Sequence, residues 1–381
     1  MNRDTGTYAI STTLGEPVRA FVPHALPPTG PALAPAVYAE LNRQAELALA
    51  RLAGVSGLVP SVDWLLYSAI RKEALLTSQI EGTQATLTDL FDEEAGFKVR
   101  NTDDVEEVTN YLRAFRWVQA QLRAPKGLPI SVRLLCDAHR LLLDGARGAG
   151  KQPGELRRSQ NWVGGTRPGN AAFVPPPPER VPALLADMEH FIHDDGTELP
   201  PMVKVALIHA QFETIHPFLD GNGRIGRLLI AALFEHWGLL AKPLMYLSGY
   251  LKQYQAEYYR RLSNIRTEGD WEAWVTFFLE GVAMAAADAE RNIIEVASLV
   301  AADRKRLLQS QAGPASYRLF EMLPLMPRFT IERVRQQLDT SFPTATAAVK
   351  VLENLGIVAE MTGQKKNRNY SYQAYVELLS R

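Results

Sequence analysis

The chain has 381 residues, enough for two to three domains of about 150 residues each, and 46% of them are hydrophobic, as in a well-packed globular protein. Its 41 Lys and Arg residues are balanced by 42 Asp and Glu residues, so bulk attraction to nucleic acid or to an anionic membrane is not indicated and any anion site must be local. A single cysteine, Cys136, excludes an internal disulfide framework and a cysteine-built zinc site, as is typical of a reducing compartment.

The first residues give no sign of export. Residues 1–10 lack the apolar centre of a signal peptide, and no uncharged apolar run reaches the ~20 residues that a membrane span needs. We therefore expect a cytoplasmic protein without membrane contact. Residues 1–36 contain several prolines, and each fixes its own φ and favours extended backbone in the residue before it. This composition predicts an extended arm that lies on the body.

Apolar residues at helical spacing dominate the chain from residue 37 to residue 308, so the main body is predicted to be mostly α. Between Gly150 and Pro178 the pattern breaks, and two short segments, 161–163 and 171–174, flank a polar turn and predict a small hairpin. The predicted helical regions are 37–143, 179–193, 200–215, 223–237, 251–267 and 271–308.

The C-terminal part has a different pattern. Three short helices near 316–322, 330–338 and 343–354 precede an apolar strand at 357–359, a polar turn and a strand at 370–372, an order typical of a winged-helix module. Nine basic and six acidic residues give it a net charge of only +3. Its predicted recognition helix has Lys350 as its only cation, so we favour packing or protein docking over DNA binding. Three cations would suit a wing that touches phosphate: Lys365, Lys366 and Arg368.

The most informative segment is 216–227, His-Pro-Phe-Leu-Asp-Gly-Asn-Gly-Arg-Ile-Gly-Arg. Pro217 ends the preceding helix, so the imidazole of His216 should project from a helix end. The Gly-Asn-Gly run at 221–223 can adopt positive φ and turn consecutive N–H groups toward one point. Such a nest, at the start of the next helix, binds phosphate.

Two arginines in the first turn of that next helix oppose its macrodipole. Arg224 and Arg227 are three residues apart, and each costs ~0.3–1 kcal/mol there unless a polyanion occupies the site. Asp220 could cap the helix or supply one oxygen to a Mg²⁺ ion held mainly by phosphates. The simpler alternative is a helix–loop–helix with Asp220 as N-cap, His216 satisfied in the core and both arginines solvated.

Eight of the twelve residues match, position by position, the motif of the Fic family of nucleotidyltransferases, and the resemblance covers most of residues 60–300. They are His216, Phe218, Asp220, Gly221, Asn222, Gly223, Arg224 and Arg227. The resemblance implies a helical Fic core, with ATP as substrate and AMP transferred to a Ser, Thr or Tyr hydroxyl of a target protein and of the protein itself. By this resemblance His216 is the general base and Asp220 the Mg²⁺ ligand. The ATP-binding residues would be Gly221, Asn222, Gly223, Arg224 and Arg227.

The predicted hairpin resembles the flap of the family, to which a target segment adds as an extra strand. Prolines after Val174 should keep that edge free of internal pairing. A surface hairpin without a docking role is the alternative. The flap residues would be Asn161, Val163, Ala172, Phe173 and Val174.

A second motif, residues 77–82, ends a helix predicted over about 62–82. Gly82 suits the position after a helix end, whereas the Glu81 carboxylate lies at the negative end of the helix dipole and is unfavourable unless a cation answers it. A solvated glutamate on a frayed turn is the alternative. The pattern Thr77, Glu81, Gly82 resembles the inhibitory helix of Fic proteins that carry it before the core. That resemblance implies that Glu81 pairs with Arg227 and blocks the γ-phosphate position.

These observations predict an N-terminal arm and helices (1–110), a Fic catalytic core (111–310) and a winged-helix-like domain (314–381). The predicted function is a self-inhibited protein adenylyltransferase. A DNA-binding regulator whose core senses nucleotide, or a Fic enzyme that uses another nucleotide or removes AMP, stays open, as does a homodimer. Three further residues could approach a nucleotide: Tyr258, Tyr259 and Asn292.

Overall fold

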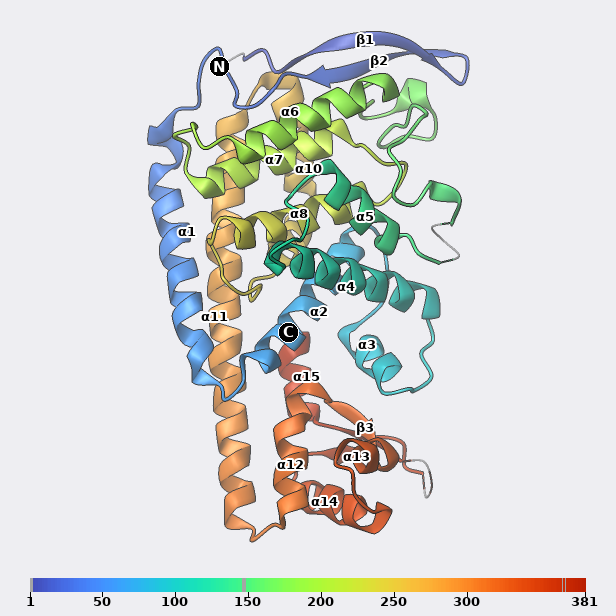
Figure 1. Ribbon diagram of the computed structural model, residues 1–381, viewed down its shortest axis with the longest axis vertical. Coiled ribbons are helices and arrows are strands. Elements are labelled where there is room, and N and C mark those ends of the chain that lie inside the picture. The colour runs from blue at the N-terminus through green and yellow to red at the C-terminus, as the bar shows by residue number, and fades with distance from the viewer. Residues whose placement is uncertain (1–2, 146–148, 365, 367) are drawn as a thin grey trace.

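The computed structural model describes residues 3–145, 149–364, 366 and 368–381, and Lys365 lies outside them. It is mostly helical with small antiparallel sheets, as the sequence predicts (Figure 1). No helix in these ranges combines the length and the apolarity that crossing a bilayer requires. The N-terminal helical region comprises α1 (Pro35–Val55), α2 (Val62–Ile80), α3 (Leu87–Glu94), α4 (Thr102–Arg123) and α5 (Val132–Leu142).

The N-terminal segment differs from the expected extended arm. Strands β1 (Gly6–Thr13) and β2 (Glu16–Pro23) pair antiparallel, with Gly6 opposite Pro23. Leu14 and Gly15 form the turn, both with positive φ (51° and 78°), which matches the right-handed twist of a hairpin. The β-branched and aromatic residues of these strands outweigh the prolines, so most of the expected arm is a hairpin.

The central layer positions the loop at 216–221. Helix α7 (Pro201–Ile215) is buried on all sides, and α8 (Asn222–His236) packs against it and against α4. The predicted helix at 251–267 is divided at Tyr254 into α9 and α10. Helix α11 runs the length of the molecule and packs against α1 and α7 (Figure 1). The remaining bounds are α6 (Val181–His193), α9 (Leu247–Gln253), α10 (Gln255–Glu268) and α11 (Trp271–Gln309).

The C-terminal part has the order of helices and strands that a winged-helix module would show, and that assignment stays a prediction. Its sheet has the order β3-β5-β4. Pattern reasoning missed β3 and the last helix, because both are short. The elements are α12 (Pro314–Met322), β3 (Arg328–Thr330), α13 (Ile331–Gln337), α14 (Phe342–Asn354), β4 (Ala359–Glu360), β5 (Asn369–Ser371) and α15 (Gln373–Ser380).

The C-terminal part is joined to the body by polar contacts. Arg328 forms an ion pair with Asp92 of α3 at 2.9 Å, and Arg333 donates to the Glu94 carbonyl oxygen. The buried Tyr372 hydroxyl donates to Asp303 of α11 at 2.6 Å. Two of the cations counted in the sequence therefore hold the module to the body and are not free to meet a nucleic acid.

Candidate functional site

His216 lies where helix α7 ends. It is the C-cap residue, with left-handed backbone angles (φ 50°, ψ 62°), and its N–H donates to the Phe212 carbonyl oxygen at 2.9 Å. Its Nδ1 lies 3.4 Å from the Glu213 carbonyl oxygen, so the ring proton belongs on Nδ1 and Nε2 keeps its lone pair. Burial lowers the pKa of His216 to about 4. The imidazole is therefore neutral at neutral pH and can accept a proton.

The start of α8 is a helix N-terminus without a side-chain cap among the described residues. Gly221 is the N-cap residue with φ 74°, and no side chain accepts from the first turn of the helix. Asp220 does not cap α8, since its Oδ1 accepts from the Gly221 N–H at 2.7 Å. The free N–H groups of the first turn and the positive end of the helix dipole together attract an anion.

The side chain of Asn222 is used inside the loop. Its Oδ1 accepts from the Phe218 N–H and its Nδ2 donates to the Phe218 carbonyl oxygen, both at 2.8 Å. The phosphate contact expected of Asn222 stays a prediction, and in this conformation its side chain bonds to the loop backbone. Asn222 instead fixes the loop between His216 and α8.

His139 of α5 supports the same loop, and pattern reasoning missed it. Its ring stacks on the buried Phe218 with 3.8 Å between centroids. Its Nδ1 accepts from the Gly154 N–H at 2.9 Å, so its Nε2 donates to the Asp220 carbonyl oxygen at 3.0 Å. The sequence around His139 does not predict that it supports the loop, because its contact to Asp220 joins residues 81 positions apart.

Both arginines of α8 are held by carboxylates from the N-terminal helices. Arg224 pairs with Glu107 of α4 at 2.7 Å, and its other terminal nitrogen lies 3.6 Å from Asp220. The Arg227 side chain is 2% exposed and pairs with Glu81 at 2.5 Å. Burial alone would lower the pKa of Arg227, but the Glu81 carboxylate and other nearby groups more than offset it, so the pKa is raised.

Thr77 and Gly82 complete the motif at the end of α2. The Arg227 Nε donates to Thr77 Oγ1 at 2.5 Å, and its Nη2 donates to the Thr77 carbonyl oxygen at 3.0 Å. Gly82 follows the C-cap residue Glu81 with φ 102°. A Cβ on Gly223 would lie 2.3 Å from Glu81 Oε1, so the absence of that atom lets the carboxylate lie over the start of α8. The Glu81 carboxylate thus lies beside Gly223 and pairs with Arg227 at the start of α8.

Glu213 is a half-buried residue three positions before His216. Burial raises its pKa to about 7 against an ordinary 4.5, and the Arg227 charge only partly opposes this. One of its oxygens, Oε1, is buried without a hydrogen-bond partner among the described residues.

The raised pKa of Glu213 predicts a pH-dependent stability. Since the unfolded chain loses this proton near pH 4.5 and the folded chain near pH 7, the folded state should lose stability as the pH rises through that window. Glu213→Gln should remove this loss and raise the Tm more at pH 8 than at pH 5. Thermal unfolding of both proteins measures it, with exposed Glu268→Gln as the control. An equal pH dependence in all three would contradict the prediction.

The expected hairpin is present in a minimal form. Val163 and Phe173 exchange both backbone hydrogen bonds, at 2.8 and 3.1 Å, and Asn161 Nδ2 donates to the Phe218 carbonyl oxygen at 3.0 Å. The expectation that the edge after Phe173 stays free is wrong, because the Phe21 N–H of β2 donates to the Val174 carbonyl oxygen at 2.9 Å. Val163 and Ala172 remain exposed, whereas Val174 is buried.

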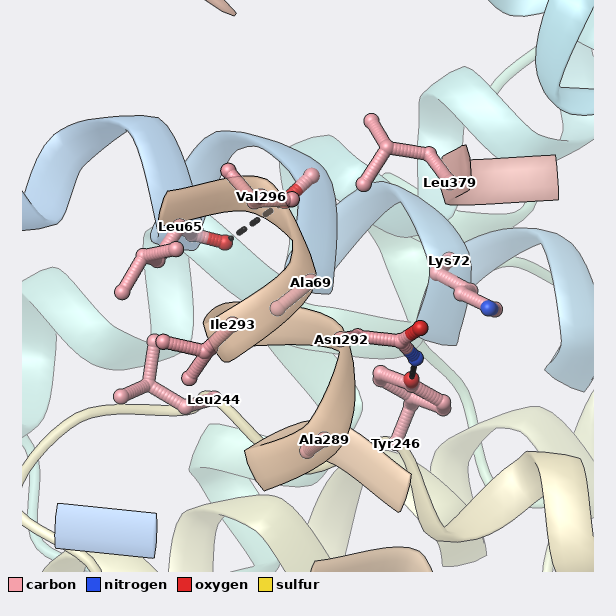
Figure 2. Close-up of a pocket in the computed structure, with 11 residues that line it drawn as sticks. Leu65, Ala69, Lys72, Leu244, Tyr246, Ala289, Asn292, Ile293, Val296 and Leu379 are labelled. Atoms are coloured by element: carbon pink, nitrogen blue, oxygen red, sulfur yellow. Dashed lines mark hydrogen bonds between the residues drawn. The ribbon is translucent and has the colours of Figure 1, made fainter. Parts of the chain in front are cut away.

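Tyr259 is the one exposed residue of the three further candidates for nucleotide contact. The buried Tyr258 hydroxyl is hydrogen-bonded to His209 Nε2 at 2.9 Å. Asn292 donates to the Tyr246 hydroxyl and lines a cavity between α2 and α11, together with Lys72 (Figure 2). That cavity measures about 30 Å³, room for little more than a water molecule.

Two family models match this architecture. The model described as "Fic/DOC family N-terminal" matches residues 39–119, which include Glu81 and Glu107, and the model "Fic/DOC family" matches residues 129–234, which include the loop and α8. The chain belongs to the Fic/DOC family. The resemblance read from the motif is therefore confirmed for the family and its helical fold.

Curated relatives of this Fic chain carry the name "Protein adenylyltransferase Fic". The protein from Drosophila grimshawi is 31% identical over 185 residues, 48% of this chain and 34% of the relative, and that from Drosophila willistoni is 29% identical over 208 residues, 53% and 38%. The chain thus spans about a third of the length of these relatives.

Solved structures share the fold. A Fic family protein from Desulfovibrio desulfuricans G20 superposes with a TM-score of 0.55 at 21% identity, covering 89% of this chain and 96% of its own. Fic-1 from C. elegans (residues 134–508) gives 0.53 at 22% identity, covering 68% and 73%.

Proposed function

We propose that this Fic protein is a self-inhibited protein adenylyltransferase that transfers AMP from ATP to a Ser, Thr or Tyr hydroxyl of a target protein and of itself. The observation that carries the proposal is a neutral imidazole, with Nε2 available, beside an uncapped helix start flanked by two arginines. The names of the curated relatives support the same activity. The proposal includes the expected cytoplasmic location.

The reaction follows from this arrangement. Nε2 of His216 takes the proton of the hydroxyl, the hydroxyl oxygen attacks the α-phosphorus, and the bond to the β-phosphate oxygen breaks, so that pyrophosphate leaves. The N–H groups of residues 222–224 and the Arg224 and Arg227 guanidinium groups stabilise negative charge on the phosphates. His216 is thus the catalytic base, and the nest with its two arginines is the phosphate site.

Asp220 suits a Mg²⁺ ion that the nucleotide brings. The side chain is 47% exposed, and among the described contacts only Oδ1 accepts a hydrogen bond. No group of three or more metal-ligating side chains exists among the described residues, so phosphate oxygens and water would supply most ligands. The bound ion would neutralise charge on the phosphates.

Asp220→Ala should weaken Mg²⁺-dependent ATP binding by about tenfold or more, because it removes the carboxylate from the ion. Calorimetric titration with ATP, with and without Mg²⁺, measures this, and exposed Asp195→Ala serves as the control. Equal metal dependence in the parent and in Asp220→Ala would contradict the role.

The test of the activity uses the Glu81→Gly variant and the parent. Each is incubated with Mg²⁺ and labelled ATP, CTP, GTP or UTP, alone and in lysate, and mass spectrometry locates the label. Label from ATP on a hydroxyl supports adenylylation. Preference for another nucleotide, or release of AMP from a modified protein, would assign the alternative chemistries.

A DNA-binding regulator with a merely sensing core has less support. A sensor needs neither a base nor a metal ligand, yet His216 and Asp220 both stand at the site, and Arg328 and Arg333 bind α3. A homodimer is left to a measurement of mass in solution.

A further inference from the structure

Arg157 carries a buried charge that no acid of the described residues pairs with. The residue is 2% exposed, and all of its guanidinium contacts are backbone carbonyl oxygens. Nε donates to His216 at 2.9 Å, and Nη2 donates to Pro176 at 2.5 Å and to Ile215 at 3.4 Å. Nη1 donates to Ser159 at 3.4 Å. The side chain thus joins three separate stretches of backbone.

Such burial is costly, so the contacts must offset it. Taking a guanidinium out of water is unfavourable, and burial lowers the pKa of Arg157 to about 10. The carbonyl groups of Ile215 and His216 lie at the C-terminal, negative end of α7, where they have no partner within the helix. A cation is favourable at this position. Arg157 therefore stabilises the helix end that bears His216.

The backbone of His216 needs this support. Left-handed angles are unfavourable in a non-glycine residue, and His216 holds φ 50°. Arg157 fixes the His216 carbonyl oxygen through its side chain, and its own N–H donates to the Pro217 carbonyl oxygen at 2.9 Å. The strained turn is therefore held from both sides by one residue.

The same guanidinium reaches the root of the hairpin. Pro176 follows the strand of Phe173 and Val174, and Gln160 Nε2 adds a second bond across this root, to the Pro175 carbonyl oxygen at 2.8 Å. A displacement of the hairpin relative to His216 would break the contacts of Arg157 on one side or the other.

We propose that Arg157 is the positioning residue that holds the hairpin and the His216 backbone as one rigid unit, so that a hydroxyl presented along the hairpin meets Nε2. This inference rests on the proposed function. Arg157 contacts neither the nest nor Arg227, so its role is in the chemical step and not in binding of ATP.

The test compares Arg157→Met and Arg157→Lys in the Glu81→Gly background, with Arg158→Ala as the matched control. Arg158 is the next residue, exposed, and bonded only to Glu155. A misplacement of about 1 Å costs about 10²-fold. We expect kcat to fall about 10²-fold in Arg157→Met and less in Arg157→Lys, with KM for ATP unchanged. Arg158→Ala should behave like its parent.

Two further readouts make the test decisive. Thermal unfolding reports whether each variant is folded. If Arg157→Met does not fold, the kcat and the NMR spectrum of Arg157→Lys test the proposal. An NMR spectrum of the nucleotide-free protein follows the His216 Cε1–H resonance, which should move in Arg157→Met and Arg157→Lys but not in Arg158→Ala. This readout needs no transfer, so it separates failure of the inference from failure of the proposed function. Folded variants with parental kcat and an unmoved resonance would overturn it.

Discussion

His216→Ala is expected to reduce transfer of AMP by about 10²–10⁴-fold while the dissociation constant of ATP stays within about threefold of that of the parent. The imidazole lies at the end of α7 and bonds only to backbone, so its loss removes the base without opening the phosphate site. Burial holds its pKa at about 4, so in the parent the neutral form prevails above that pH. A rate that depends on this base should therefore not fall between pH 8 and pH 6.

Single-turnover assays at saturating ATP and an independent binding titration measure the two effects separately. His190→Ala, on the exposed face of α6, is the control for a change of histidine to alanine. Undiminished transfer in a folded His216→Ala protein would remove the base from the mechanism, and parallel loss of ATP binding would make His216 a structural residue.

The sequence was sufficient for the parts of the site that lie close together along the chain. Pro217 sets the end of α7, and the glycines at 221 and 223 allow the turn and the uncapped start of α8, so His216, Asp220 and the nest follow from local rules. The helical body follows from the spacing of the apolar residues, because a helix predicted from a long periodic segment is rarely changed by tertiary packing.

The missing parts are long-range contacts between polar groups. His139 under Phe218, Glu107 against Arg224 and the guanidinium of Arg157 join residues that no periodicity brings together. The N-terminal hairpin was missed for another reason, since prolines at its margins masked a strand pattern and a two-residue turn. The paired edge at Val174 depends on that hairpin and could not be predicted without it.

The Fic resemblance implied that Glu81 pairs with Arg227, and the placement of each charge is unfavourable without the other. The carboxylate lies at the negative end of α2 and the guanidinium at the positive end of α8. The Arg227 Nη2 and Glu81 Oε1 atoms lie 2.5 Å apart, so the two opposite charges compensate each other. The pair stabilises this conformation, and under the proposed function Arg227 would have to leave Glu81 before it could bind the γ-phosphate.

Glu81→Gly should raise the rate of transfer by about tenfold or more, and Arg227→Ala in that background should abolish the gain, because the freed group is gone. Glu93→Gly, an exposed glutamate in the last turn of α3, is the matched control and should not change the rate. Removing Glu81 also leaves the buried Arg227 guanidinium without its carboxylate partner, although its contacts to Thr77 remain, so the nucleotide-free protein should be less stable. We therefore expect Glu81→Gly to have a lower Tm without nucleotide and a larger Tm increase with Mg²⁺-ATP than the parent, since the γ-phosphate replaces the lost carboxylate. Arg227→Ala should suppress that larger increase. If the two changes are additive in both rate and Tm, Glu81 and Arg227 act independently and the contact between them is not the inhibitory one.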